Sequence, residues 1–174
     1  MSTALLPPIR HGRIASASRA RVVASARAWI GTPYHDQASL RGVGCDCLGL
    51  ARGLWRDVVG PERVSIPPYS RDWGEVARRE VLAEGAGQVM IRIDPQAAGA
   101  GAVVLFRMRE RAVVKHLGIL TGEGTFIHAT ERLGVIEEVL TRAWVRRIAF
   151  AFLYPRPGRC PRSGRRPRPA AQEA

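Results

Sequence analysis

The chain has no long apolar run and little cysteine, and each shortage argues against a class of protein. No stretch approaches the roughly 18 apolar residues of a membrane-spanning helix, so we expect no membrane anchor. Three cysteines in 174 residues are an odd number and do not indicate a disulfide framework. The N-terminal arginines are not followed by an uninterrupted apolar stretch or a small-residue cleavage site. We therefore expect no signal peptide and synthesis in the cytoplasm.

Acidic residues are scarce at both ends, where the net charge of +12 is concentrated. Residues 1–30 contain five arginines and no acid, and residues 155–174 contain six arginines and one glutamate. A nucleic-acid reader would carry its arginines on a folded face with interleaved aromatic residues, so we expect no specific nucleic-acid binding. We interpret the basic ends as solvated segments, with docking to an acidic partner or an anionic wall as the alternative.

The length is enough for a single domain with a sizeable core. We expect a flexible lead at residues 1–15, a folded domain at 16–154 and a tail at 155–174. The Pro- and Arg-rich tail has nothing with which to build a core, so we expect it to be disordered or ordered only on a partner.

Apolar periodicity changes character halfway along the chain. In the first half it predicts helices at residues 16–30, 47–59 and 72–84, then a loop at 85–101 with a short extended piece at 89–93. In the second half it predicts strands at residues 102–106, 116–121, 125–129, 134–139 and 148–153. Helices first and strands second, without alternation, favour an α+β fold with an antiparallel sheet.

Cys47 immediately precedes an amphipathic helical pattern and is the candidate nucleophile. At the first turn of a helix, unpaired backbone N–H groups and the positive end of the helix dipole favour a thiolate. Asp46 before it either caps the helix or binds substrate. Cys45 lies ahead of the helix, and we interpret it as a structural thiol. A zinc site is the alternative, although a single Cys-x-Cys is a poor zinc signature.

A nucleophilic cysteine needs a base and a group that orients the base, and His116 and His128 are the candidates. A glycine-containing turn separates them. If residue 120 pairs with 124, the two histidines lie directly opposite each other; if 121 pairs with 125, they are diagonal neighbours on one face. A two-residue loop would put them on opposite faces. A catalytic triad therefore requires a loop with an odd number of residues.

Four segments resemble, in order, the motifs of the NlpC/P60 cysteine peptidases: Gly31-Thr32-Pro33-Tyr34, Asp46-Cys47-Leu48-Gly49-Leu50, His116-Leu117-Gly118-Ile119-Leu120-Thr121-Gly122 and Ile127-His128-Ala129. The resemblance implies a papain-like α+β fold and hydrolysis of a γ-D-glutamyl–diamino-acid bond in the stem peptide of peptidoglycan. It implies catalysis by Cys47, His116 and His128, substrate contacts from Tyr34 and Asp46, and no metal or cofactor. Leu48 departs from the family, which has at this position a serine that helps recognise a free amine.

The form of the segment from Gly44 to Leu50 further resembles phage cell-wall peptidases encoded among tail genes, including those of gene transfer agents. This resemblance implies a protein carried on a phage-like tail, with tail hub or baseplate proteins as partners, that acts on the recipient cell wall after release. Two alternatives stay open. One is a structural tail-tip component with little or no activity, and the other is a different thiol amidase or acyltransferase on the same fold.

Overall fold

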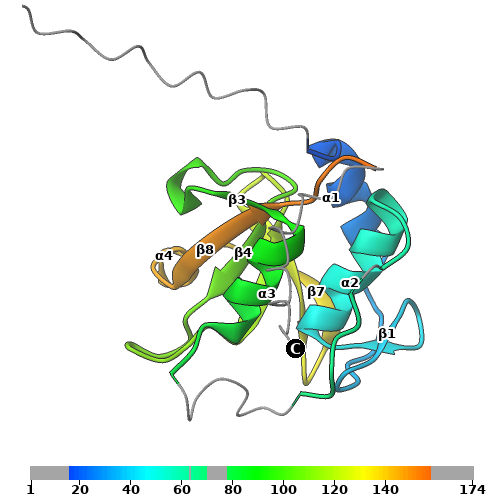
Figure 1. Ribbon diagram of the computed structural model, residues 1–174, viewed down its shortest axis with the longest axis horizontal. Coiled ribbons are helices and arrows are strands. Elements are labelled where there is room, and N and C mark those ends of the chain that lie inside the picture. Colours follow the sequence, from blue (N-terminus) through cyan, green and yellow to red (C-terminus); the bar gives the residue numbers. More distant parts are fainter. Residues whose placement is uncertain (1–15, 63, 70–77, 158–174) are drawn as a thin grey trace, which may run out of the picture.

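A six-stranded sheet forms the centre of the computed structural model, which describes residues 16–62, 64–69 and 78–157 (Figure 1). Its strands follow the order β3-β8-β4-β5-β6-β7, and all neighbours are antiparallel. The strands are β3 (Ile91–Ile93), β4 (Val103–Phe106), β5 (His116–Leu120), β6 (Thr125–Thr130), β7 (Gly134–Val139) and β8 (Ile148–Leu153). The five strands predicted in the second half and the short extended piece before them are thereby confirmed.

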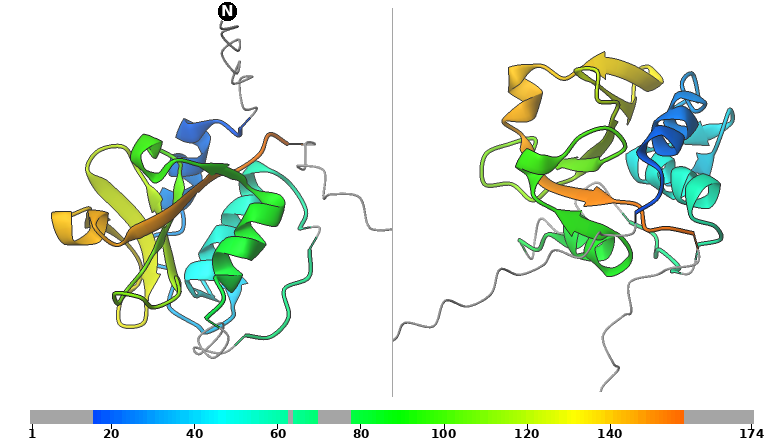
Figure 2. Two further views of the ribbon diagram at one scale, coloured as in Figure 1. Left: turned by 60° about the vertical axis from the view of Figure 1, so that its left-hand side comes forward. Right: turned by 90° about the horizontal axis from the view of Figure 1, so that it is seen from above.

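The longer helices lie beside this sheet, and α1 and α2 together cover one of its faces (Figure 2). A small hairpin of β1 (Ser39–Leu40) and β2 (Gly44–Cys45) precedes α2. The helices are α1 (Arg19–Arg27), α2 (Cys47–Val58), α3 (Val81–Val89), the short α4 (Arg142–Val145) and the 3-10 turn η1 (Pro95–Ala97). An antiparallel sheet packed on the helix that carries Cys47 confirms the predicted α+β fold.

The sheet is buried on both faces, which explains the nearly continuous apolar character of its central strands. Alternate residues of β4 belong to different cores. Val103 and Leu105 face the core that includes α1 and α2, whereas Val104 and Phe106 face a second core. Trp144 of α4 packs against this second core. The two faces of one sheet thus provide two distinct environments for the side chains of the hairpin that follows β4.

The prediction of a helix at residues 72–84 was wrong in its position. Residues 72–77 lie outside the described part of the chain, residues 78–80 are not helical, and α3 extends through the glycine- and alanine-rich stretch to Val89. Glycine disfavours a helix by about 1 kcal/mol per residue, but packing of an amphipathic face outweighs such propensities. Ala83 is buried, and Leu82, Ala86 and Val89 pack onto the main core. Burial of this apolar face explains why the helix covers Val81–Val89 rather than residues 72–84.

The two ends of the described domain lie together. Ser16 forms an isolated bridge with Pro155, and the Ala17 N–H donates to the Tyr154 carbonyl at 2.8 Å. The Tyr154 hydroxyl donates to the Ala51 carbonyl at 3.0 Å, which ties the end of β8 to α2. The predicted lead at 1–15 and the tail from residue 158 lie outside the described residues, so the predicted domain boundaries stay predictions.

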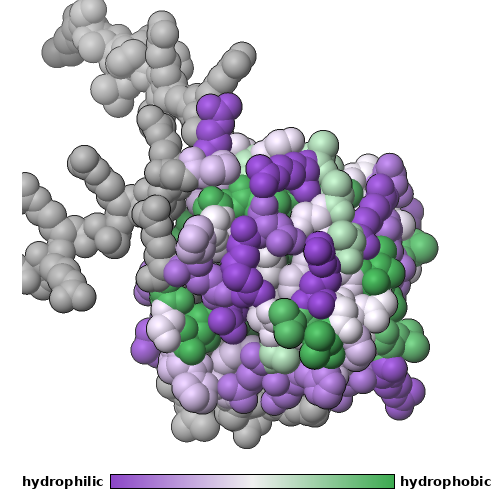
Figure 3. All heavy atoms as spheres, turned by 90° about the vertical axis from the view of Figure 1, so that its right-hand side faces the viewer, coloured by the Kyte–Doolittle hydropathy of each residue, from purple (hydrophilic) through white to green (hydrophobic). Residues whose placement is uncertain are grey.

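The face of the molecule drawn in Figure 3 is mixed in character. Among the described residues, no helix has the length and apolar character needed to cross a bilayer. Figure 3 shows the face on the side of α1, α2 and β1, where hydrophilic side chains are interspersed with small apolar clusters. Leu40 and Val43, at the tip of the β1–β2 hairpin, are among the exposed apolar residues.

Candidate active site

Asp46 fixes the start of α2 and is almost fully buried. Its Oδ1 accepts a hydrogen bond from the Gly49 N–H at 2.6 Å, which is the helix-capping interaction. Its Oδ2 accepts from the Gln37 N–H at 2.8 Å and from the Tyr69 hydroxyl at 2.5 Å. The carboxylate therefore caps the helix, as one of the two sequence interpretations holds, and also joins it to two loops. The substrate-binding role of Asp46 stays a prediction.

The loop that carries Tyr34 lies directly against the start of α2. A Cβ at Gly49 would lie 1.8 Å from the Ala38 carbonyl oxygen, so only glycine permits this approach. Tyr34 forms a parallel bridge with Cys45 and is half-buried. Burial, followed by the charge that Cys47 would carry as a thiolate, raises the pKa of Tyr34 to about 12. Tyr34 is therefore a protonated hydroxyl close to Cys47 at neutral pH.

Cys47 lies at the first turn of α2 and faces the start of β5. Its Sγ is 3.9 Å from the Lys115 carbonyl oxygen. Burial, and secondly the Asp46 carboxylate, raise the pKa of Cys47 to about 12, while the N–H groups of Leu117, Leu48 and Cys47 itself lower it. The helix start does favour a thiolate, as predicted, but burial outweighs it. Cys47 is a neutral thiol at pH 7 until a base removes its proton.

The strands β5 and β6 separate near Cys47. Their ladder contains two residue pairs, Ile119 with Ile127 and Leu120 with Phe126, and it ends before the first residues of β5. The Lys115 carbonyl and the Leu117 N–H, on either side of His116 in the chain, both interact with Sγ of Cys47. Cys47 thus lies against the backbone on both sides of the predicted base.

His116 and His128 lie on one face of the β5–β6 hairpin. The Thr121 N–H donates to the Thr125 carbonyl at 3.1 Å across a three-residue turn, which is the second of the two registers considered above. This register makes His128 the same-face diagonal neighbour of His116. His116 Nε2 and His128 Nδ1 are 2.8 Å apart, within hydrogen-bond distance. The odd loop therefore brings the two rings together as the sequence predicts.

Gly118 provides the space that this pairing needs. A Cβ at this position would lie 2.6 Å from Phe126 Cδ2, on the face that carries both histidines. Gly49 and Gly118 both allow a close approach, and packing of the helix on the sheet is the cause at neither position. At Gly49 the neighbour is a loop carbonyl, and at Gly118 it is a side chain from the adjacent strand.

Glu138 and Trp144 complete the row and were missed by the sequence interpretation. His128 Nε2 is 3.0 Å from Glu138 Oε2, and the Trp144 indole N–H donates to Glu138 Oε1 at 3.0 Å. His128 pairs with Ile136 in the β6–β7 ladder, so Glu138 is again a same-face diagonal neighbour. The parity argument used for the first hairpin would have identified Glu138 if it had been applied to the second. Trp144 lies on α4, a helix that the periodicity does not indicate.

Both histidines are held neutral by their surroundings. The rings of Phe106, Phe126 and Trp144 pack around them, with Phe106 stacked on His116 at a centroid distance of 5.9 Å. Burial, followed by the effect of His128, lowers the pKa of His116 to about 3. Burial also lowers the pKa of His128, against the opposing effect of Glu138. At pH 7 the site therefore contains a neutral thiol and neutral imidazoles.

Cys45 is not part of this row of hydrogen-bonding side chains. Cys45 is fully buried, and burial raises the pKa of its thiol to about 12, in keeping with a structural thiol. Within residues 16–62, 64–69 and 78–157, no cluster of three or more His, Cys, Asp or Glu side chains could hold a metal ion. Cys160 lies outside these ranges.

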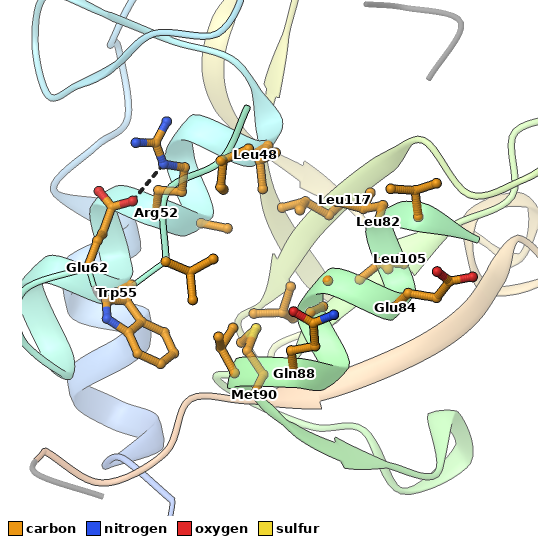
Figure 4. A pocket seen from close by; sticks show the side chains of 18 of the residues that line it. Leu48, Arg52, Trp55, Glu62, Leu82, Glu84, Gln88, Met90, Leu105 and Leu117 are labelled. Atoms are coloured by element: carbon orange, nitrogen blue, oxygen red, sulfur yellow. Dashed lines mark hydrogen bonds and ion pairs between the residues drawn. The ribbon is translucent and has the colours of Figure 1, made fainter. Parts of the chain in front are cut away.

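A largely apolar cavity of about 400 Å³ lies between α2 and α3. Leu48 and Leu117, the chain neighbours of Cys47 and His116, line it at the end away from Met90 and Gln88 (Figure 4). The Arg52–Glu62 ion pair is part of its lining, with Arg52 Nε 2.8 Å from Glu62 Oε2. The cavity therefore provides apolar space next to residues that adjoin the candidate nucleophile and base.

A cysteine at a helix start that faces a histidine-bearing antiparallel sheet defines the papain-like class of fold. The model of the NlpC/P60 family matches residues 31–152, and the chain belongs to this family. A search of curated proteins finds no match.

Solved structures of the family share the fold at low sequence identity. An NlpC/P60 family protein from Bacillus cereus is 22% identical with a TM-score of 0.57, over 81% of this chain and 41% of its own. The NlpC/P60 domain of the peptidoglycan hydrolase SagA is 23% identical with a TM-score of 0.53, over 78% of this chain and 97% of its own. NlpC1 from Trichomonas vaginalis is 19% identical with a TM-score of 0.52, over 84% of this chain and 45% of its own. The chain thus spans nearly all of the SagA domain but less than half of the other two proteins.

Proposed function

We propose that this protein is a cysteine peptidase that hydrolyses an amide bond in the stem peptide of peptidoglycan. Membership of the NlpC/P60 family supports the proposal, and one relative of the same fold is a peptidoglycan hydrolase. The observation that carries it is the placement of Cys47 against the start of β5, where His116 begins a row of hydrogen-bonding side chains. Such a row is what a base needs in order to be held and oriented.

In the proposed mechanism, His116 takes the proton from the Cys47 thiol as the sulfur attacks the scissile carbonyl carbon. The low pKa of His116 and the high pKa of Cys47 mean that the two begin as a neutral pair rather than an ion pair. Proton transfer is therefore coupled to the attack, and His116 acts as a general base. His128 holds the His116 ring through the contact of 2.8 Å.

The tetrahedral intermediate carries its negative charge on the former carbonyl oxygen. Backbone N–H groups at the start of α2, including that of Cys47, and the Tyr34 hydroxyl are the proposed donors to this oxygen. The carbon–nitrogen bond then breaks, and His116 returns its proton to the leaving amine. Water hydrolyses the resulting thioester with His116 again as the base, which releases the carboxylate and restores the thiol.

The proposed bond is the γ-D-glutamyl–diamino-acid amide, which the family resemblance implies. Tyr34 and Asp46 are the proposed substrate contacts. Leu48 replaces the family's serine and lines the apolar cavity, so we expect this protein to contact an aliphatic part of the stem peptide there rather than an amine. The mechanism uses only side chains and backbone groups of the chain and needs no metal or cofactor.

Digestion of purified cell wall tests the proposal, with Cys47→Ala and Cys45→Ala as a matched pair. Both changes remove a thiol from the same short segment, but only Cys47 lies at the helix start, against the backbone on both sides of His116. We expect Cys47→Ala to abolish release of soluble wall fragments and Cys45→Ala to retain most of it. Equal loss in both variants, with both still folded by circular dichroism, would contradict the assigned nucleophile.

We further propose that the protein is carried on a phage-like particle and acts on the recipient wall after release. The support is the resemblance of the segment around Cys47 to tail-associated peptidases, together with a substrate that lies outside the membrane. Tail hub or baseplate proteins are the proposed partners, and the basic ends of the chain are the proposed docking segments. A structural tail-tip role is the alternative, for which Cys47→Ala would leave wall penetration by particles unchanged.

A further inference from the structure

Glu138 ends the row of hydrogen-bonding groups that starts at His116, and its position has a consequence for where the ring protons lie. Its Oε1 accepts from the Trp144 indole N–H at 3.0 Å, and its Oε2 is 3.0 Å from His128 Nε2. The Glu138 side chain is 40% exposed, whereas that of His128 is 2% exposed. The carboxylate thus reaches from solvent to a buried imidazole, and a tryptophan holds its other oxygen in place.

We propose that Glu138 is a positioning residue that sets the tautomers of both histidines and so leaves Nδ1 of His116 free to act as the base. A carboxylate can only accept, so the single proton of neutral His128 lies on Nε2. His128 Nδ1 is then an acceptor, and His116 Nε2, at 2.8 Å, must donate to it. The single proton of neutral His116 is therefore on Nε2, and its Nδ1 carries the free lone pair. The role of Glu138 in catalysis rests on the proposed function, whereas the positions of the ring protons do not.

The contact of Glu138 with Trp144 explains why only a carboxylate at position 138 gives these tautomers. The indole N–H is a donor only, so the group facing it must present an acceptor. A glutamine at position 138 has one acceptor and one donor end. With its oxygen toward Trp144, its amide would donate to His128 Nε2 and move the His128 proton to Nδ1. His116 would then carry its proton on Nδ1, where it cannot accept one from Cys47.

The same row stabilises the charge that develops during catalysis. When His116 takes the Cys47 proton, its positive charge is one ring away from the Glu138 carboxylate. Glu138 already favours the protonated form of His128 against burial. The buried row therefore places a fixed negative group behind the imidazolium, as an orienting carboxylate does in other histidine-dependent hydrolases.

The test combines Glu138→Gln with Trp144→Phe. We expect Glu138→Gln to lower kcat for wall hydrolysis by about 100-fold with little change in KM, since Glu138 acts on His116 through His128. Adding Trp144→Phe removes the competing donor and lets the glutamine oxygen accept from His128, so the double variant should regain at least tenfold over Glu138→Gln. Glu137→Gln is the matched control on the opposite face of β7, where Glu137 pairs with Arg27, and should retain wild-type kcat.

Nitrogen chemical shifts of the imidazoles provide a readout that needs no substrate. In the Cys47→Ala protein we expect protons on Nε2 of both histidines, and on Nδ1 of both when Glu138→Gln is added. Unchanged tautomers, or a double variant no more active than Glu138→Gln, would overturn the positioning role. If the protein hydrolyses no wall but the tautomers still invert, the proposed function fails and the inference stands.

Discussion

At the scale of single residues, the site is a set of neutral groups that burial holds ready for proton transfer. The sequence predicts Cys47, His116 and His128 as the site residues because their motifs and hairpin parity are local signals. It could not indicate the protonation state, because the pKa of Cys47 depends on how fully the folded chain covers it. The helix start alone predicts a lowered pKa, whereas burial and Asp46 raise it to about 12.

The lowered pKa of His116 predicts how stability depends on pH. The folded pKa is about 3 and the ordinary value is 6.5, so the unfolded chain binds more protons between these two pH values. The contribution of His116 to the free energy of unfolding is complete above pH 6.5 and is lost as pH falls toward 3. Urea unfolding from pH 4 to 7 should show a shallower pH dependence for His116→Gln than for the wild type. Equal slopes for the two proteins would contradict the burial of a neutral imidazole.

At the scale of elements, the positions of the strands and of the helix after Cys47 were predictable, since their apolar periods are clear. The position of α3 was not predictable, because packing on the sheet stabilises a glycine-containing segment that propensity disfavours. The pairing registers of β5 with β6 and of β6 with β7 decide which side chains lie together in the candidate site. The three-residue turn between β5 and β6 was within reach of the sequence, but the contribution of β7 required the same argument one hairpin further on.

The close fit between β5 and β6 predicts a contrast between two glycine substitutions. At Gly118 a methyl group would meet Phe126, so Gly118→Ala should lower the free energy of unfolding by about 1–3 kcal/mol through overpacking. At Gly85 in α3 a Cβ meets nothing within 4 Å, so Gly85→Ala should raise it by about 0.5–1 kcal/mol. Chemical denaturation measures both. A harmless Gly118→Ala would mean that the histidine face is more open than the structure has it.

At the scale of the whole molecule, residues 31–154 are nearly balanced in charge and lie between two basic stretches, residues 1–30 and 155–174. Three of the five arginines in the first stretch, Arg19, Arg21 and Arg27, lie on α1 and so belong to the folded domain rather than to a solvated tail. Carriage on a particle predicts that the protein co-purifies with released phage-like particles and that wall hydrolysis follows the particle fraction. Density-gradient fractionation with detection of the protein in each fraction is the measurement. Activity found only in free, particle-less fractions would rule out delivery and leave a housekeeping or lysis role.

The most direct test of the central claim is mass analysis of muropeptides after digestion of purified cell wall. The proposed chemistry predicts fragments that have gained one water at the bond between D-glutamate and the diamino acid, with a new amine on the diamino acid. These fragments should be absent with Cys47→Ala. Intact stem peptides after prolonged digestion with the folded wild-type protein, or the same fragments from Cys47→Ala, would contradict the account.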